Sequence, residues 1–172
     1  MKNITLSLAA FLCLLGTSLS AQTQTGSIMI GGNAGFNSSD GITQIEVAPM
    51  LGFFVIDQLA VGASLSFLNQ SSDFGDGTRI EIGPFVRYYF MGEGKARVFG
   101  QANFDWTSIK SGDLDAVTGT AFGGGAGVSI FLNDHVAIDG LVGYTSRSFG
   151  EGDAVGTFGI QFGVQAFFGG GN

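Results

Sequence analysis

The amino-acid sequence predicts an all-β fold, an eight-stranded antiparallel up-and-down transmembrane β-barrel preceded by a cleaved signal peptide. In residues 157–168, apolar side chains alternate with polar or small ones, and this period of two indicates a strand long enough to cross a bilayer at a tilt. Only 12% of the residues are charged and 45% are hydrophobic, against a charged share of about 25% in soluble domains. Outside residues 1–21 there is no run of the roughly 18 apolar residues that a membrane helix needs, so the composition favours membrane strands.

Residues 1–21 have the pattern of a secretory signal peptide. Lys2 supplies a positive start, residues 4–15 are apolar, and residues 16–21 are mostly small, which predicts cleavage after Ala21. An N-terminal anchor helix is the alternative, but the apolar run is too short to span a bilayer. The mature chain would therefore be a single barrel domain, residues 22–172.

Charge and cysteine content exclude several classes of protein. Without Lys2, six basic residues remain against 14 acidic ones, a net charge of −8, whereas nucleic-acid binding calls for a basic patch. The single cysteine, Cys13, lies within the signal peptide, and Leu12 before it is too large for a lipoprotein signal. The mature chain can therefore form no disulfide and no thiolate metal site.

Eight segments of the mature chain alternate between apolar and polar positions. They are residues 27–37, 43–54, 59–68, 79–90, 98–107, 120–132, 135–147 and 157–168. Residues 45–54 align with 80–89 at an offset of 35, and residues 122–132 align with 158–168 at an offset of 36. That length fits one hairpin of two membrane strands, although a solenoid can also have such a period.

Two features bear on how the segments pair. The connections after the second, fourth and sixth segments are short, while those after the others are longer and rich in Ser, Gly and Asp, as expected for periplasmic turns and external loops. Pro49 and Pro84 lie within the second and fourth segments. Because proline cannot donate a ladder hydrogen bond, we expect a bulge or a locally missing bond near each.

Three stretches carry a family resemblance: residues 83–90 (GPFVRYYF), residues 53–62 (FFVIDQLAVG) and the ending with Gln161, Gly163, Ala166 and Phe168. With them, the whole mature chain resembles the small eight-stranded outer-membrane β-barrel family, OmpX-like or OmpA transmembrane-domain-like, and in particular the porin-family outer membrane protein β-barrel domain of Bacteroidota. The four residues of the ending resemble the signal that the barrel-assembly machinery reads. Two departures are the small Ala166 and the extra residues 169–172.

The resemblance implies a monomer in the outer membrane of a Gram-negative bacterium, with both termini of the mature chain in the periplasm. Its partners would be outer-membrane lipid, lipopolysaccharide and, during biogenesis, the barrel-assembly machinery; no external ligand is implied. We expect a non-enzymatic structural or surface-interaction role, in envelope integrity, adhesion or binding through external loops. A narrow pore for ions or small solutes is the alternative, and an outer-membrane lipid-modifying enzyme is the third possibility.

Seven charged residues fall on the inward side of the predicted barrel. They are Glu46, Arg79, Glu81, Arg87, Asp105, Asp139 and Arg147. An eight-stranded barrel is just wide enough for its own side chains, and buried charges must be paired or hydrogen-bonded. We therefore favour a structural polar network that plugs the barrel over a lumen that binds or conducts cations.

Other candidate sites are weak, and no cofactor site is predicted. The only histidine, His135, follows a short turn, at the opposite strand end from Ser146 and Ser148, so a catalytic grouping is not predicted. Residues 73–77 resemble part of a calcium loop but lack its spaced acids and distal Glu. Seven acids in the predicted external loops are expected to be solvated, with cation bridges to lipopolysaccharide as the alternative: Asp40, Asp73, Asp76, Asp113, Asp115, Glu151 and Asp153.

Aromatic residues gather at both ends of the predicted strands, and those that point outward would form interfacial girdles. At the ends assigned to the periplasm they are Phe53, Phe54, Tyr88, Tyr89, Phe90, Phe131, Phe167 and Phe168. At the external ends they are Phe36, Phe67, Phe104, Trp106 and Tyr144.

Overall fold

The computed structural model describes residues 23–39, 42–72, 77–91, 95–112, 115–150 and 153–169. The predicted signal peptide lies outside these residues. Eight strands follow in chain order: β1 (Ile28–Ser39), β2 (Ile42–Ile56), β3 (Leu59–Ser72), β4 (Gly77–Met91), β5 (Ala96–Ser111), β6 (Val117–Phe131), β7 (Val136–Phe149) and β8 (Val155–Phe168). No helix in the described chain is long and apolar enough to cross a membrane.

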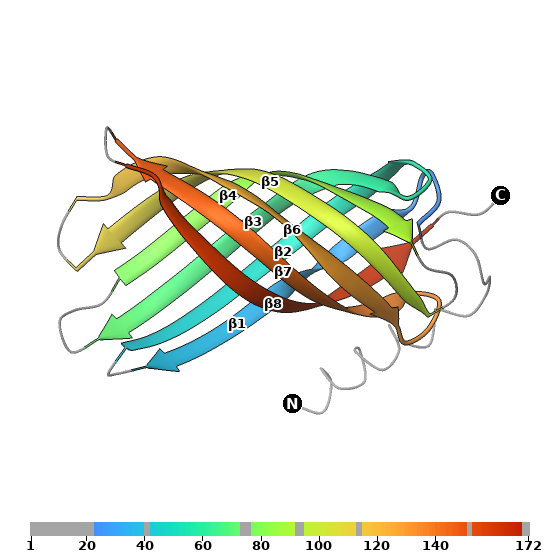
Figure 1. Ribbon diagram of the computed structural model, residues 1–172, viewed down its shortest axis with the longest axis horizontal. Coiled ribbons are helices and arrows are strands. Elements are labelled where there is room, and N and C mark those ends of the chain that lie inside the picture. Colours follow the sequence, from blue (N-terminus) through green and yellow to red (C-terminus); the bar gives the residue numbers. More distant parts are fainter. Residues whose placement is uncertain are drawn as a thin grey trace, which may run out of the picture.

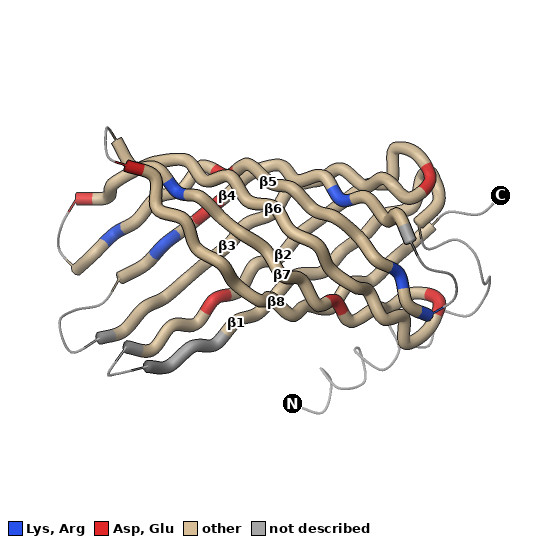
Figure 2. Tube along the Cα trace, in the orientation of Figure 1, with Lys and Arg blue, Asp and Glu red and all other residues tan. Residues whose placement is uncertain are grey.

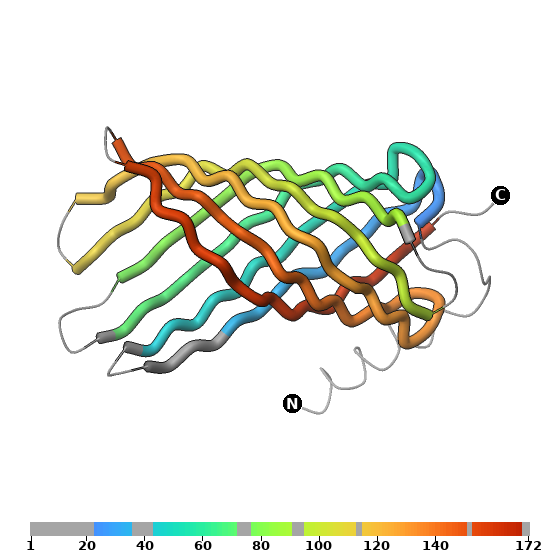
Figure 3. The backbone as a smooth tube through the Cα atoms, viewed as in Figure 1, coloured from blue at the N-terminus to red at the C-terminus, as the bar shows by residue number. Residues whose placement is uncertain are grey.

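Each strand pairs antiparallel with its neighbours in sequence, and β8 pairs with β1 to close the barrel (Figure 1). The predicted fold class is confirmed. The start of β1 and the end of β8 lie side by side at one end of the barrel (Figure 3), which we call the proximal end. The distal end carries the connections that follow β1, β3, β5 and β7.

The alternation predicted from sequence separates the wall from the interior. Along β4, every second residue is buried and its neighbours are exposed: Glu81, Gly83, Phe85, Arg87 and Tyr89 are buried, while Ile82, Pro84, Val86 and Tyr88 are exposed. The outer wall carries large apolar side chains such as Leu51, with 55% exposed. The charged residues are few and leave most of the wall uncharged (Figure 2). A chain with this pattern is stable only where lipid covers its outer face.

The predicted strands are too short at the distal end, and the expected contrast between short and long connections is wrong. β3 continues to Ser72 and β5 to Ser111, and only two residues separate β1 from β2, as between β2 and β3. Backbone hydrogen bonds do not depend on side-chain polarity, so Ser, Thr and Asn extend the ladders beyond the apolar band. Residues that looked like loops therefore belong to strands.

Both prolines interrupt one ladder without shifting its register. In the described part of β2, pairing with β3 passes from Val47–Phe67 to Met50–Ser64, and it skips Ala48 and Pro49. Pairing of β4 with β5 likewise skips Gly83 and Pro84, whereas their other ladders stay continuous. Because a residue's backbone nitrogen points to only one neighbour, each proline costs bonding on one side. The predicted local loss is confirmed.

Candidate functional site: the barrel interior

The proximal half of the interior is centred on a buried ion pair between β4 and β7. Arg87 Nη1 lies 2.5 Å from Asp139 Oδ2, and both side chains are almost fully buried. Ser129 Oγ donates to the other carboxylate oxygen at 2.6 Å. Arg87 also donates from Nε to Gln101 Oε1 at 2.9 Å and from Nη1 to Tyr89 Oη at 3.2 Å. The pair thus has the additional hydrogen bonds that a buried charge requires.

Aromatic rings surround this pair and fill the rest of the proximal interior. The Arg87 guanidinium lies 4.1 Å from the centre of the Phe99 ring, within the range of a cation–π interaction. Five inward rings form a connected chain: Phe99, Tyr89, Phe54, Phe167 and Phe131. We call these rings, together with Arg87 and Asp139, the proximal plug.

Glycine on β6 makes room for the plug. A Cβ atom at Gly127 would lie 2.5 Å from Phe99 Cζ, closer than real contacts allow. The inward Gly123 has a similar relation to Asn103 on β5, whose Oδ1 would lie 2.4 Å from an added Cβ. At Gly127 and Gly123 the small inward row of β6 is therefore filled by side chains of β5, whereas Gly125 between them borders a distal cavity.

The distal half of the interior is more polar and less fully paired. Glu81 accepts two hydrogen bonds from Arg147, at 2.7 Å from Nε and 3.1 Å from Nη2, in the bidentate arrangement typical of arginine and carboxylate. Arg79 Nε lies 3.4 Å from the same carboxylate but has no hydrogen-bond partner among the residues that the structure describes. Glu46 accepts a hydrogen bond from Ser66 at 2.8 Å and forms no ion pair within the described chain. Asn103 donates to Asp105.

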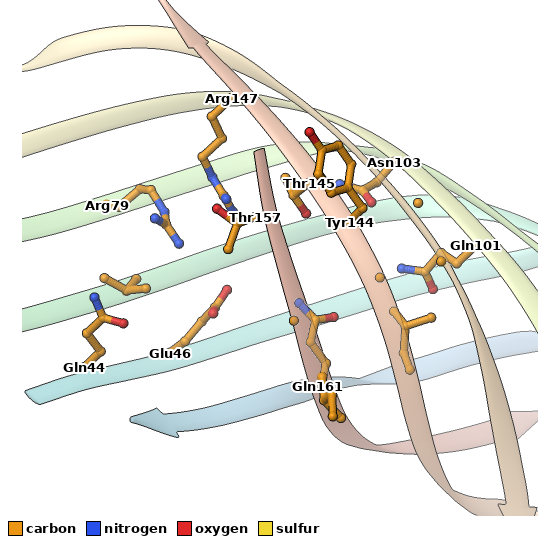
Figure 4. A pocket seen from close by; sticks show the side chains of 17 residues that line it. Gln44, Glu46, Arg79, Gln101, Asn103, Tyr144, Thr145, Arg147, Thr157 and Gln161 are labelled. Carbon is orange, nitrogen blue, oxygen red and sulfur yellow. The ribbon is translucent and has the colours of Figure 1, made fainter. Parts of the chain in front are cut away.

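A cavity of about 350 Å³ lies among these distal side chains. Arg79 and Glu46 point into it from β4 and β2, and Thr157 and Gln161 border it from β8 (Figure 4). A smaller cavity of about 70 Å³ lies against Glu46, Glu81 and Asp105. The interior is thus closed proximally and hollow distally.

The structure divides the seven predicted lumen charges between these two halves. It brings Arg87 together with Asp139 in the proximal half. Glu81 lies with Arg147 and Arg79 in the distal half, and Asp105 and Glu46 lie beside them at the smaller cavity.

Sequence reasoning missed most of the neutral partners. No role was predicted for Gln101 or Phe99, although both lie on the inward row of β5. The position of Phe99 on the inward row of β5, opposite the glycines of β6, is a signal that identifies it as a plug residue.

The predicted assembly residues lie on the closing strand. Phe168 pairs with Ile28 of β1 and Ala166 with Ile30. Gly163 approaches Asn33 so closely that a Cβ would lie 2.1 Å from Asn33 Oδ1. Gln161 accepts a hydrogen bond from Asn33 Nδ2 at 3.3 Å. The proximal part of β8 is thereby matched to β1, and residues 170–172 lie outside the described chain.

The histidine and the loop acids do not join either half. His135 lies in the proximal β6–β7 turn, where its Nδ1 is 3.2 Å from the backbone oxygen of Phe167, and Ser146 and Ser148 lie near the distal end of β7. Asp115 and Asp153 are exposed at the distal end. The other five predicted loop acids and most of the calcium-like segment lie outside the described residues.

Outward aromatic side chains ring the wall near both ends. Distal ones are Phe67, Phe104, Trp106, Phe122, Tyr144 and Phe158; proximal ones are Phe53, Tyr88, Phe90 and Phe168. The distal rings contact one another between strands, with centroid distances of 4.7 Å for Phe104–Phe122 and 4.8 Å for Tyr144–Phe158. The side chain of Phe36 is not among those that the structure describes. This is the arrangement of two interfacial girdles.

Comparisons with known proteins agree with this architecture. The family model described as outer membrane protein beta-barrel domain matches residues 8–168. Neisserial surface protein A is similar, with a TM-score of 0.61 and 16% identity over 81% of this chain and 94% of that one. The N-terminal β-barrel domain of Pseudomonas aeruginosa OprF gives a TM-score of 0.57 and 17% identity over 84% and 98%.

The outer membrane protein OprG of the same species gives a TM-score of 0.55 and 13% identity over 88% of this chain and 99% of that one. These likenesses concern the fold. No curated protein sequence matches the chain.

Proposed function

Because the chain belongs to the outer membrane protein β-barrel domain family, we propose that it is a non-enzymatic, non-conducting outer-membrane barrel with a structural or surface-interaction role. The distal end would face the outside and both termini of the mature chain the periplasm. Outer-membrane lipid and lipopolysaccharide would surround the wall. The barrel-assembly machinery would recognise β8 during insertion, and the folded protein would be a monomer.

The proximal plug carries this proposal. Ions that cross the lumen would have to pass the Arg87–Asp139 pair and the inward rings around it, all of which are buried. Moving a close-packed ring aside loses its packing, and separating the buried pair exposes two uncompensated charges. Both effects oppose steady conduction and favour a barrel that works through its outer surfaces.

A polar collar at the distal end supports a surface role. At about 3.3 Å per residue and a tilt of about 40°, the 15 residues of β4 rise about 38 Å, more than the roughly 25 Å of a barrel's apolar band. Beyond the distal girdle the outward side chains become polar: Asn69, Ser71, Thr78, Lys110 and Thr118. The collar would hold these side chains rigidly outside the membrane.

Planar-bilayer recording tests the closed lumen. We expect purified native protein to give no steady openings, and a Tyr89→Ala/Phe99→Ala/Phe167→Ala variant, in which three rings of the plug are truncated, to give measurable conductance. Phe53→Ala/Tyr88→Ala/Phe90→Ala removes three outward aromatics and is the matched control, expected to stay closed. Steady, ion-selective openings by the native protein would favour the pore instead.

Two further measurements test the orientation and the surface role. A membrane-impermeant maleimide should label Lys110→Cys on intact cells and Asp134→Cys only after permeabilisation; the reverse would overturn the orientation. A collar variant, Asn69→Ala/Ser71→Ala/Thr78→Ala, should weaken adhesion or envelope integrity relative to cells with native protein, at equal surface expression. If the collar variant left the phenotype unchanged and deletion of the gene altered the masses of lipid A, the lipid-modifying enzyme would be favoured instead.

A further inference from the structure

The barrel wall is incomplete between β1 and β8 in its distal half. The ladder between these strands runs from Ile28–Phe168 to Ala34–Phe162 and ends there, although β1 continues to Ser39 and β8 begins at Val155. Each strand remains paired on its other side, β1 with β2 and β8 with β7, to its distal end. The two strands diverge in Figure 1, so a lateral opening separates them beyond Ala34–Phe162.

Solvent exposure confirms the opening. Thr157, Gly159 and Gln161 occupy inward positions on β8 but are exposed, whereas Glu81 and Asp105, inward in the same half of the barrel, are buried. Among the described residues, a Cβ atom added at Gly159 would meet nothing within 4 Å. The hydrogen bond from Asn33 to Gln161 lies at the point where the ladder ends.

The opening crosses the distal part of the apolar band. On β8 the outward apolar residues run from Phe158 to Phe168, about 25 Å of height at about 3.3 Å per residue and a tilt of about 40°. Phe158, Ile160 and Phe162 are 79%, 67% and 65% exposed. Free strand edges do not occur against lipid unless they line a polar cavity or are covered, and here the distal cavity lies directly behind them.

The cavity holds groups of both charges that are incompletely paired. Thr157, Gly159 and Gln161 line it together with Arg79 and Glu46. Arg79 Nε is buried without a hydrogen-bond partner, and the Glu46 carboxylate has Ser66 as its hydrogen-bond donor and no ion-pair partner among the described residues. An anionic group suits Arg79, with Arg147 nearby, and a cationic group suits Glu46.

We propose that the opening between β1 and β8 admits a zwitterionic lipid of the phosphoethanolamine type from the surrounding membrane. Its phosphate would bind Arg79 and its ammonium group Glu46, while its acyl chains would remain against Phe158, Ile160 and Phe162. A purely anionic head group would face Glu46, Glu81 and Asp105, and a purely cationic one would face both arginines. An added peptide strand is disfavoured because the diverging edges let it pair fully with only one of them.

Native mass spectrometry of the purified barrel tests the ligand. Equimolar phosphatidylethanolamine, phosphatidylglycerol and glycerophosphoethanolamine are the probes. We expect phosphatidylethanolamine to be retained at least tenfold more than either of the others, and Glu46→Gln or Arg79→Gln to remove that preference. Equal retention of phosphatidylglycerol would overturn the head-group assignment, and equal retention of glycerophosphoethanolamine would assign the cavity to a soluble zwitterion instead.

A disulfide tests the route. If the ladder register continued, Gly35 would pair with Gln161, and paired positions in an antiparallel ladder lie within disulfide reach. Oxidised Gly35→Cys/Gln161→Cys should lose most of the retained lipid and regain it on reduction. Thr78→Cys/Lys110→Cys, exposed partners in the closed β4–β5 ladder, is the matched control and should retain the lipid in both states.

Gly159→Phe blocks the opening without a cross-link, because the new ring would occupy the open space beside Gly159. It should lower lipid retention at least tenfold while heat-modifiable gel migration shows a folded barrel. Unchanged retention by folded Gly159→Phe, or by the oxidised Gly35→Cys/Gln161→Cys variant, would overturn the lateral route. Stronger retention of a seven-residue peptide with alternating apolar and polar residues would assign the opening to a protein strand instead.

Discussion

The two halves of the lumen are built from the same strands but reach opposite solutions. Proximally, Arg87 has one carboxylate partner, several further hydrogen-bond partners and a ring beneath it, and it is about 1% exposed. Distally, two arginines share Glu81, Glu46 has no ion-pair partner among the described residues, and a cavity remains. The difference lies in the inward row, which carries large aromatic side chains in the proximal half and mainly polar, charged or glycine residues in the distal half. The inward aromatic rings therefore fill the proximal lumen, and their absence leaves the distal lumen hollow.

Breaking the proximal ion pair should have the largest effect. Arg87→Ala leaves Asp139 charged in a dry interior, so we expect a loss of about 3–5 kcal/mol in the free energy of unfolding, measured by urea unfolding in lipid vesicles. The double variant Arg87→Met/Asp139→Leu removes both charges and should lose clearly less. A double variant less stable than Arg87→Ala would contradict this account of the plug.

Truncation of Phe99 should lower the free energy of unfolding by nearly as much as Arg87→Ala does. Phe99→Ala opens a cavity beside Gly127 and removes the cation–π contact of Arg87, so a loss of about 3 kcal/mol is expected in the same assay. Phe104→Ala, on the opposite face of β5, is the control, because lipid can fill the space that it leaves. Equal losses for the two variants would show that packing against Gly127 is not special.

The distal charges should matter less. Glu81→Gln keeps the volume of the side chain but weakens its two hydrogen bonds to Arg147, and we expect a loss of about 1.5 kcal/mol in the free energy of unfolding. Glu46 forms no ion pair within the described chain, so Glu46→Gln should change the free energy of unfolding less than Glu81→Gln does. If Glu81→Gln were as damaging as Arg87→Ala, the distal half would be as tightly coupled as the proximal half.

The smallest effect should come from the proximal turn, outside the lumen. Asp57 accepts hydrogen bonds from the backbone N–H and the hydroxyl of Thr25, at 2.8 and 2.9 Å, and these bonds hold the pKa of its carboxyl below the usual value. A lowered folded-state pKa contributes stability that is present above the unfolded pKa, about 3.9, and is lost as pH falls through the folded value.

Asp57→Asn should therefore lower the urea midpoint slightly at pH 7, and its difference from the native protein should shrink below about pH 4. Asp153→Asn, an exposed acid at the distal end, is the control without a hydrogen bond to the N-terminal segment. A difference that grows in acid would have the wrong sign for this linkage.

Much of this fold could be predicted because alternation is local. The inward or outward position of each residue from Ile45 to Phe53, for example, follows from the period of two. The interruptions at Pro49 and Pro84 were also predictable, since proline lacks a donor wherever it is placed. Strand ends were not, because Ser72 and Ser111 join ladders through their backbones, which side-chain polarity does not reveal.

The sequence by itself determined the strand number, the faces and seven of the inward charges, since these depend on residue order along one strand; Arg97, which lies over the inward Phe131 ring, was not predicted to face inward. Only the tertiary structure decided which charges meet. Arg87 and Asp139 are 52 positions apart, and their contact depends on barrel closure and on the glycines that admit Phe99. It also decided where β1 and β8 separate, because pairing between the first and last strands requires the whole barrel to curve through the intervening six.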